Sequence, residues 1–211
     1  MTVTAIREIA KSRVLVSVDE TFAFVLYKGE LRSYGLKEGQ EITEEAYRDI
    51  MENLLPRRAK LRAMNLLKNR SYTEKQLYDK LKAGDYPEEI IEQALDYVRS
   101  YHYIDDRQYA EDYIEYHKES RSRSRILRDL VQKGISIELA GEVYEEKAGE
   151  DRTKLEKEQI LNLMHKKNFV PNEATFEENR SFQHFCTEKD FRLIRSDVHF
   201  YLTAQRFKFK I

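Results

Sequence analysis

The segment Asp79–Ile91, DKLKAGDYPEEII, is echoed 49 residues later by Arg128–Ala140, RDLVQKGISIELA. In both copies a helix-spaced apolar pair precedes a residue that accepts left-handed backbone, Asp85 or Gly134, and an anchor residue and a new helix start follow it. Because these features recur at a fixed offset, they indicate a tandem helical repeat in which stacked units bury a common core. Repeat arrays of this kind usually bind long partners.

Helical periodicity sets the limits of the first two units. The first covers residues 56–102, where Ser71–Glu74 has the spacing of a capping box and Pro87 suits the first turn of a third helix. The second covers residues 103–150 and has the same design, with Asp105 as a helix N-cap. Each unit is therefore expected to contain three helices.

A fainter third unit is expected over residues 151–211, where Asp190-Phe191 repeats the stop and the anchor. Residues 1–55 differ in being rich in β-branched and aromatic residues, and they predict a β hairpin at Arg13–Val18 and Thr21–Tyr27, with a possible third strand before it and a short helix after it. The fold class is thus mainly α: an elongated array of three tandem three-helix repeats with a small N-terminal β-hairpin segment.

The composition argues against a disulfide-bonded protein and against a membrane-spanning one. Of the 211 residues 36% are charged, while there are only 7 glycines and 3 prolines, which favours a helical, strongly solvated chain. Cys186 is the only cysteine, so an internal disulfide is impossible and a reducing compartment is expected. No run approaches the roughly 18 apolar residues of a membrane span. We therefore expect a cytoplasmic protein.

Charge is unevenly distributed although the net charge is only −1. Residues 56–82 are basic, residues 85–115 are acidic and residues 118–128 are basic again. Basic side chains cluster at the junction of the first and second helix of each unit, where they can bind phosphate or carboxylate groups. A solvated helix start explains the arginine run equally well, so both interpretations stay open here. The candidate contacts for a partner or DNA are Lys68, Arg70, Arg121, Arg123, Arg125 and Arg128.

No catalytic or metal-binding pattern stands out. Asp105 and Asp106 point about 100° apart on a helix, so they suit a helix cap better than a shared metal ion. His184 and Cys186 lack the further closely spaced ligands of a zinc site. Since there is also no Gly-rich phosphate loop and no nucleophile motif, we expect no metal, no cofactor and no enzymatic activity.

The segment Tyr103–Ala110, YIDDRQYA, followed by Leu130–Ser136, LVQKGIS, resembles the RecX family of recombination regulators. The resemblance covers about residues 57–147, and the N-terminal β segment looks like an extension seen in some members. One departure is Asp85, which stands where the family's first unit usually has glycine. The signature residues, for which we expect a structural role, are Tyr103, Asp105, Asp106, Tyr109 and Gly134.

The resemblance implies a protein that binds the RecA recombinase filament on DNA, lies along its groove and damps ATP hydrolysis and strand exchange. It would act as a monomer, with nucleic acid contacted through or beside the filament. The alternative is a direct DNA-binding module of helix-turn-helix type, which three-helix units can mimic. The third helices, around residues 88–92 and 138–146, are acidic and would be repelled by phosphate, which favours the regulator.

Overall fold

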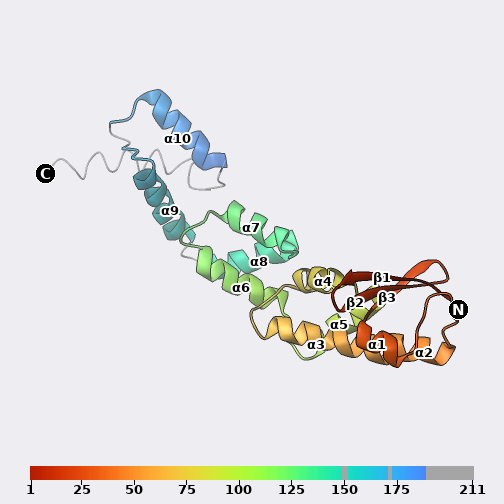
Figure 1. The fold of residues 1–211 in the computed structure, drawn as a ribbon. Helices are drawn as coiled ribbons and strands as arrows, with labels where there is room; N and C mark the ends of the chain where they lie inside the picture. The colour runs from red at the N-terminus through yellow and green to blue at the C-terminus, as the bar shows by residue number, and fades with distance from the viewer. Residues whose placement is uncertain (149–151, 171–172, 189–211) are drawn as a thin grey trace. The chain divides into compact units, whose positions relative to one another are not determined.

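The computed structural model describes residues 1–148, 152–170 and 173–188 (Figure 1). The fold is mainly α with one small antiparallel sheet at the N-terminus, as the sequence predicted. The chain divides into two compact units that meet between Asp105 and Asp106. Each unit is described by itself below.

The sheet has the strand order β1-β2-β3, with β1 at Val3–Ala10, β2 at Arg13–Val18 and β3 at Thr21–Tyr27. The turn between β2 and β3 consists of Asp19 and Glu20, whose φ angles are 49° and 66°. Two left-handed residues form the type of two-residue turn that matches the twist of a hairpin. The possible third strand before the hairpin, which the sequence suggested, is present as β1.

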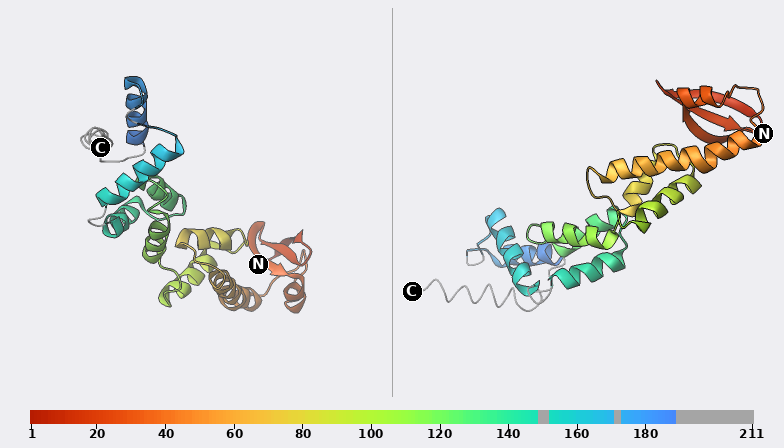
Figure 2. Two further views of the ribbon diagram at one scale, coloured as in Figure 1. Left: turned by 90° about the vertical axis from the view of Figure 1, so that its left-hand side faces the viewer. Right: turned by 90° about the horizontal axis from the view of Figure 1, so that it is seen from below.

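Five helices complete the first unit: α1 (Lys28–Ser33), α2 (Glu44–Asp49), α3 (Leu55–Leu67), α4 (Glu74–Lys82) and α5 (Glu88–Ser100). A π-helical turn at Ile50–Leu54 joins α2 to α3, and the sheet lies beside this helical path (Figure 2). The sheet and the helices share one hydrophobic core, whose buried residues include Val16, Phe24, Leu55, Leu77 and Leu95. The N-terminal segment is thus packed together with the first three-helix repeat.

Arg13 of β2 fastens the sheet to the turn after α4. Its Nη2 donates to the carbonyl oxygen of Gly84 at 2.7 Å and to Oδ2 of Asp85 at 3.0 Å. Asp85 has a φ of 60°, the left-handed conformation that its place in the repeat predicted. Aspartate tolerates the left-handed backbone that ends α4, as glycine does. Its carboxylate in addition binds Arg13 of the sheet.

The second unit contains α6 (Asp106–His117), α7 (Arg123–Gln132), α8 (Ile137–Ala148), α9 (Arg152–Lys166) and α10 (Phe176–Glu188). Helices α6, α7 and α8 enclose a core that includes Ile114, Ile126, Leu130 and Tyr144. A smaller cluster forms where Phe182 of α10 stacks on Phe169 at 4.2 Å between ring centroids. The expected stop and anchor at residues 190–191 lie outside the described residues.

Four of the described helices end in the same way. The residue after the C-cap is left-handed and donates its N–H three residues back, and the next residue donates its N–H five residues back, which is the Schellman motif. The left-handed residue and its successor are Gly35 and Leu36 after α1, His102 and Tyr103 after α5, Gly134 and Ile135 after α7, and Asn168 and Phe169 after α9. The predicted stop at Gly134 is therefore confirmed.

Two glycine substitutions in the second unit are expected to change stability in opposite directions. Gly134 has a φ of 95°, so Gly134→Ala should lower the free energy of unfolding by about 1 kcal/mol. Gly141 lies within α8, and apart from its chain neighbours and the helix backbone nothing lies within 4 Å of the position that a Cβ would take, so Gly141→Ala should raise that free energy by about 0.5–1 kcal/mol. Urea unfolding of both variants measures the two effects. Equal stability of Gly134→Ala and wild type would contradict the helix end described above.

Candidate functional site

The predicted arginine cluster lies where α6 turns into α7, and Arg121 is turned inward there. Its Nη1 donates to Oδ2 of Asp129 at 2.6 Å and to Oη of Tyr113 at 2.7 Å. Tyr113 in turn donates to the same Asp129 oxygen at 3.2 Å. Arg121 lies in the loop before α7. It therefore connects this loop to a carboxylate of α7, eight residues further along the chain, and to a tyrosine of α6.

Asp129 is the centre of this arrangement, and only 8% of its side chain is exposed. Burial by itself would raise the pKa of the Asp129 carboxyl. The hydrogen bond from Tyr113 and the charges of Arg125 and Arg121 outweigh burial, so the pKa lies below its ordinary value. A buried carboxylate that stays ionised needs these partners, because an unpaired buried charge is strongly destabilising.

The other two arginines of the run are also paired within the protein. Nε of Arg125 lies 3.0 Å from Oδ1 of Asp129, and 57% of the Arg125 side chain is exposed. Nη2 of Arg123 lies 3.1 Å from Oε1 of Glu145 on α8, and its guanidinium stands 5.6 Å from the ring centroid of Tyr144. Arg121 thus links the loop before α7 to α6 and α7, Arg123 links α7 to α8, and Arg125 forms an ion pair within α7.

The backbone of the same loop is held from α9. Gln159 is buried, and its Nε2 donates to the carbonyl oxygen of Arg121 at 2.9 Å and to that of Lys118. Sequence reasoning missed both Gln159 and Asp129. A polar residue on an otherwise apolar helix face was the available signal for each, since such residues are rarely buried without partners.

Three of the predicted basic residues are exposed and have no ion pair among the described residues. Lys68 follows α3, Arg70 lies in the turn before α4, and Arg128 is on α7. The guanidinium of Arg70 stands 4.4 Å from the ring centroid of Tyr72, which leaves its charge at the surface. In the described part of the chain none of the three forms an ion pair, so they are the candidates best suited to an external phosphate or carboxylate.

The signature residues lie on both sides of the boundary between the two units. Asp105 precedes α6 and Asp106 begins it. Tyr109 stacks on Tyr113 at 6.5 Å between centroids, next to the Asp129 arrangement. Tyr103 is 49% exposed and stacks on Tyr101. That these residues have a structural role stays a prediction.

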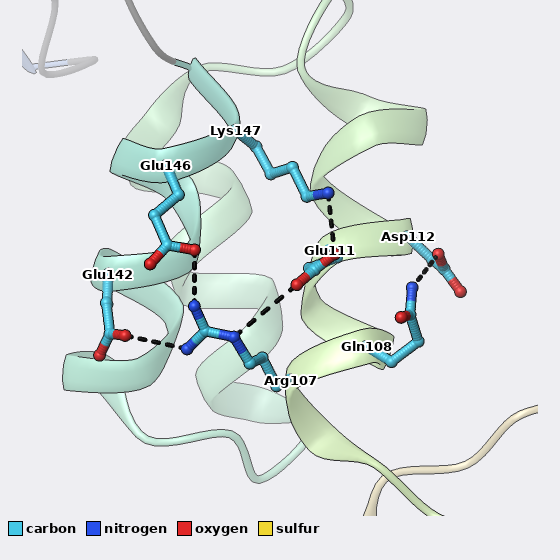
Figure 3. Close-up of polar contacts among 7 residues, drawn as sticks. All are labelled: Arg107, Gln108, Glu111, Asp112, Glu142, Glu146 and Lys147. Atoms are coloured by element: carbon cyan, nitrogen blue, oxygen red, sulfur yellow. Dashed lines mark hydrogen bonds and ion pairs between the residues drawn. The ribbon is translucent and has the colours of Figure 1, made fainter.

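Arg107, which the sequence analysis did not single out, joins α6 to α8 (Figure 3). Its Nη1 lies 2.9 Å from Oε1 of Glu142 and its Nη2 lies 2.6 Å from Oε2 of Glu146, one turn apart on α8. Lys147 of α8 reaches back to Glu111 of α6 at 2.8 Å. The hydrogen bonds to Glu142 and Glu146 raise the pKa of Arg107. Part of the acidic charge of α8 is therefore neutralised within the unit.

His117 at the end of α6 lies beside the residues that surround Asp129 and is partly buried. It packs on Tyr113 at 4.3 Å between centroids. Burial, together with the charge of Arg121, lowers its pKa, although Asp129 acts in the opposite direction. Protonation is thus disfavoured in the folded state. Neutral His117 makes its whole contribution to the free energy of unfolding above the ordinary histidine pKa of about 6.5. This contribution is lost as the pH falls through the lower pKa of His117 in the folded state.

We therefore expect the free energy of unfolding to decline as pH is lowered below about 6.5, and His117→Gln to flatten this decline. Urea unfolding at a series of pH values measures both. His165→Gln, which replaces an exposed histidine of α9, is the matched control and should keep the slope of the wild type. If the free energy of unfolding of His117→Gln falls with pH as steeply as that of the wild type, the decline is not caused by this histidine.

Among the described residues, no three His, Cys, Asp or Glu side chains gather as a metal ion would require. No helix in the part of the chain that the structure describes has both the length and the apolar character needed to cross a membrane.

Comparison with known proteins places these features in a family. A family model described as the first three-helix domain of RecX matches residues 59–97. The chain is 35% identical over 135 residues to "Regulatory protein RecX" of Caldanaerobacter subterraneus subsp. tengcongensis, which is 64% of this chain and 68% of that protein. It is 30% identical over 176 residues to "Regulatory protein RecX" of Clostridium beijerinckii, which is 83% of this chain and 81% of that protein.

Solved structures agree in fold. A crystal structure of "regulatory protein RecX" matches with a TM-score of 0.60 at 25% identity and covers 90% of this chain and 94% of its own. The RecX structure from Lactobacillus salivarius matches with a TM-score of 0.59 at 21% identity, and the match covers 72% of this chain and 96% of that chain. Since relatives match over most of their length at 30% identity or more, this chain belongs to the RecX family of regulatory proteins.

Proposed function

We propose that this protein binds the RecA–DNA filament and inhibits ATP hydrolysis and strand exchange by the recombinase. The observation that carries the proposal is the match to RecX regulatory proteins across 81% of the length of one of them. The protein would act by binding alone and as a monomer. The three-helix units proposed at residues 56–102, 103–150 and 151–211 would form the successive parts of its binding surface.

The distribution of charge supports this partner. Lys68, Arg70 and Arg128 are exposed basic side chains that suit phosphate groups of the DNA. The third helix of the first repeat, α5, is acidic on its exposed face, where Glu88, Glu89 and Glu92 lie. Such faces repel DNA but suit a protein surface. A filament offers both kinds of surface at once, whereas bare DNA offers only one.

The proposed mechanism is conformational. A protein that occupies the filament groove stabilises the filament state to which it binds most tightly. If the subunit motions that accompany ATP turnover change the groove, the bound protein opposes them, and the two binding events are coupled in both directions. Inhibition then requires no chemistry by any side chain of this protein.

Binding measurements test the partner. Fluorescence anisotropy of the labelled protein would be followed with RecA filaments on single-stranded DNA and with bare single-stranded and duplex DNA, at two salt concentrations. We expect the filament to bind at least about tenfold more tightly than either bare DNA, because protein contacts add to the salt-dependent phosphate contacts. Tight, site-selective binding to bare duplex DNA would instead support a helix-turn-helix module and contradict the proposal.

A further inference from the structure

The helix end after α5 differs from the other three Schellman ends. The residue that follows the left-handed position normally packs into the core, and Leu36 and Ile135 are accordingly 8% and 2% exposed. Tyr103 holds the same position after α5 but is 49% exposed. Its left-handed neighbour is His102 with a φ of 54°, a conformation that costs a non-glycine residue energy. The motif thus directs a large aromatic ring outward instead of inward.

Tyr103 is the outer member of a row of three tyrosines. Its ring lies 5.8 Å from that of Tyr101 with an angle of 15° between the planes, and Tyr101 lies 5.0 Å from Tyr97. Tyr101 is 58% exposed. Two adjacent, nearly parallel and half-exposed rings present aromatic surface that could be covered by a further flat or cationic group.

Elsewhere in the described residues a tyrosine of this chain usually has a basic side chain on its ring. Lys60 stands 5.2 Å from the centroid of Tyr97, for example. The other tyrosines with a lysine or arginine within about 6 Å of the centroid are Tyr27, Tyr72, Tyr78, Tyr86, Tyr109, Tyr113 and Tyr144. In the part of the chain that the structure describes, Tyr101 and Tyr103 have no such cation.

The charged side chains nearest to the two rings in sequence have a net negative charge. Asp96 and Asp105 flank them in sequence and are both exposed. Arg99, the basic residue between them, is held by Glu74 at 2.8 Å and by Asp96. A cation is attracted by the aromatic faces and by the exposed carboxylate of Asp105, whereas this carboxylate repels the phosphate groups that accompany nucleobases.

We infer that the Tyr101–Tyr103 pair is a docking site for an arginine or lysine side chain of a protein partner. The cation lies against the exposed aromatic face, and the charge of Asp105 adds to the attraction. On the proposed function above, which this step assumes, the partner is the recombinase. Tyr103 then has a binding role in place of the packing role that its sequence context suggested.

A peptide titration tests the site without the recombinase. Tyrosine-labelled full-length protein would be titrated in NMR with a short peptide that carries two arginines in an alanine and glycine background, and with the same peptide carrying glutamines. We expect saturable shifts of Tyr101 and Tyr103 with the arginine peptide only. Y101F/Y103F, which keeps the rings, should bind like wild type, and Y101L/Y103L, which keeps apolar area without them, about three- to thirtyfold more weakly.

Tyr116→Leu is the matched control, because Tyr116 is 82% exposed but does not stack on another tyrosine. It should leave peptide affinity unchanged. Equal affinity of Y101L/Y103L and wild type would overturn the inference. So would stronger shifts of the same rings by oligothymidylate than by the arginine peptide, since that result would mark a stacking site for nucleobases.

Filament binding identifies the partner separately. Y101L/Y103L should bind RecA filaments about three- to thirtyfold more weakly than Y101F/Y103F. Equal binding of the two variants would overturn the assignment of the site to the recombinase. Failure of the wild type to bind filaments would contradict the proposed function, while the peptide titration would still decide whether the tyrosine site exists.

Discussion

Replacing Lys68, Arg70 and Arg128 together with glutamine is expected to weaken inhibition of the recombinase ATPase by about one to two orders of magnitude. These side chains are exposed and have no ion pair in the described residues, so each can approach a phosphate without breaking an ion pair. On single-stranded DNA every phosphate contact that is removed also reduces the magnitude of the slope of log K against log salt by about 0.7. The concentration for half-maximal inhibition at several salt concentrations measures both effects.

Arg121 and Arg123 were equally good candidates by sequence, but they pair with Asp129 and Glu145. Replacing them would disturb the fold and the binding surface together, and lost inhibition could then not be assigned to a contact. Arg128 lies one residue before Asp129 on α7 yet points away from it into solvent.

A triple variant elsewhere on the surface provides the control. Arg7, Lys11 and Lys37 are exposed basic residues of the N-terminal segment, and their replacement with glutamine changes the net charge by the same amount. This control should inhibit like wild type. If the two triple variants lose inhibition equally, only the total charge matters, and the assignment to Lys68, Arg70 and Arg128 is wrong.

Asp129→Asn is expected to lower the free energy of unfolding of the second unit by about 2–3 kcal/mol. The carboxylate accepts charge-assisted hydrogen bonds from Arg121 and Arg125 and a further bond from Tyr113. Asparagine has nearly the same shape but presents an N–H₂ group to one of these donors, and such a mismatch in a buried site is not compensated by water. Urea or thermal unfolding measures the loss.

Asp112→Asn is the matched control, because Asp112 is an exposed aspartate of α6 whose contact with Gln108 an amide can preserve. Its effect should stay within about 0.5 kcal/mol. If Asp129→Asn is no more destabilising than Asp112→Asn, the buried carboxylate does not hold α6 and α7 together.

The sequence was sufficient for the features that depend on local spacing. The stops at Asp85 and Gly134 were predictable because left-handed backbone restricts the residue types that follow a helix. The strand alternation of Val14, Val16 and Val18 was predictable because one face of the sheet is buried. The family resemblance rested on residues 103–110, at the junction of two repeats.

The pairing of charges was not predictable in the same way. Arg121 contacts a carboxylate eight residues away, and Gln159 reaches a loop 38 residues before it. Arg107 reaches Glu142, which is 35 residues distant. Such contacts depend on how helices pack, and the sequence pattern gives the type of each residue but not the helix it faces. An arginine run that binds DNA and one that stabilises a helix junction therefore look alike before the fold is known.

The DNA-dependent ATPase of the cognate RecA recombinase, titrated with this protein, tests the central claim most directly. The account predicts that hydrolysis on single-stranded DNA falls to a low plateau as the protein occupies the filament, and that the Lys68, Arg70 and Arg128 triple variant needs a much higher concentration to reach it. Hydrolysis that stays unchanged at concentrations where the protein saturates its binding to the filament would contradict the account.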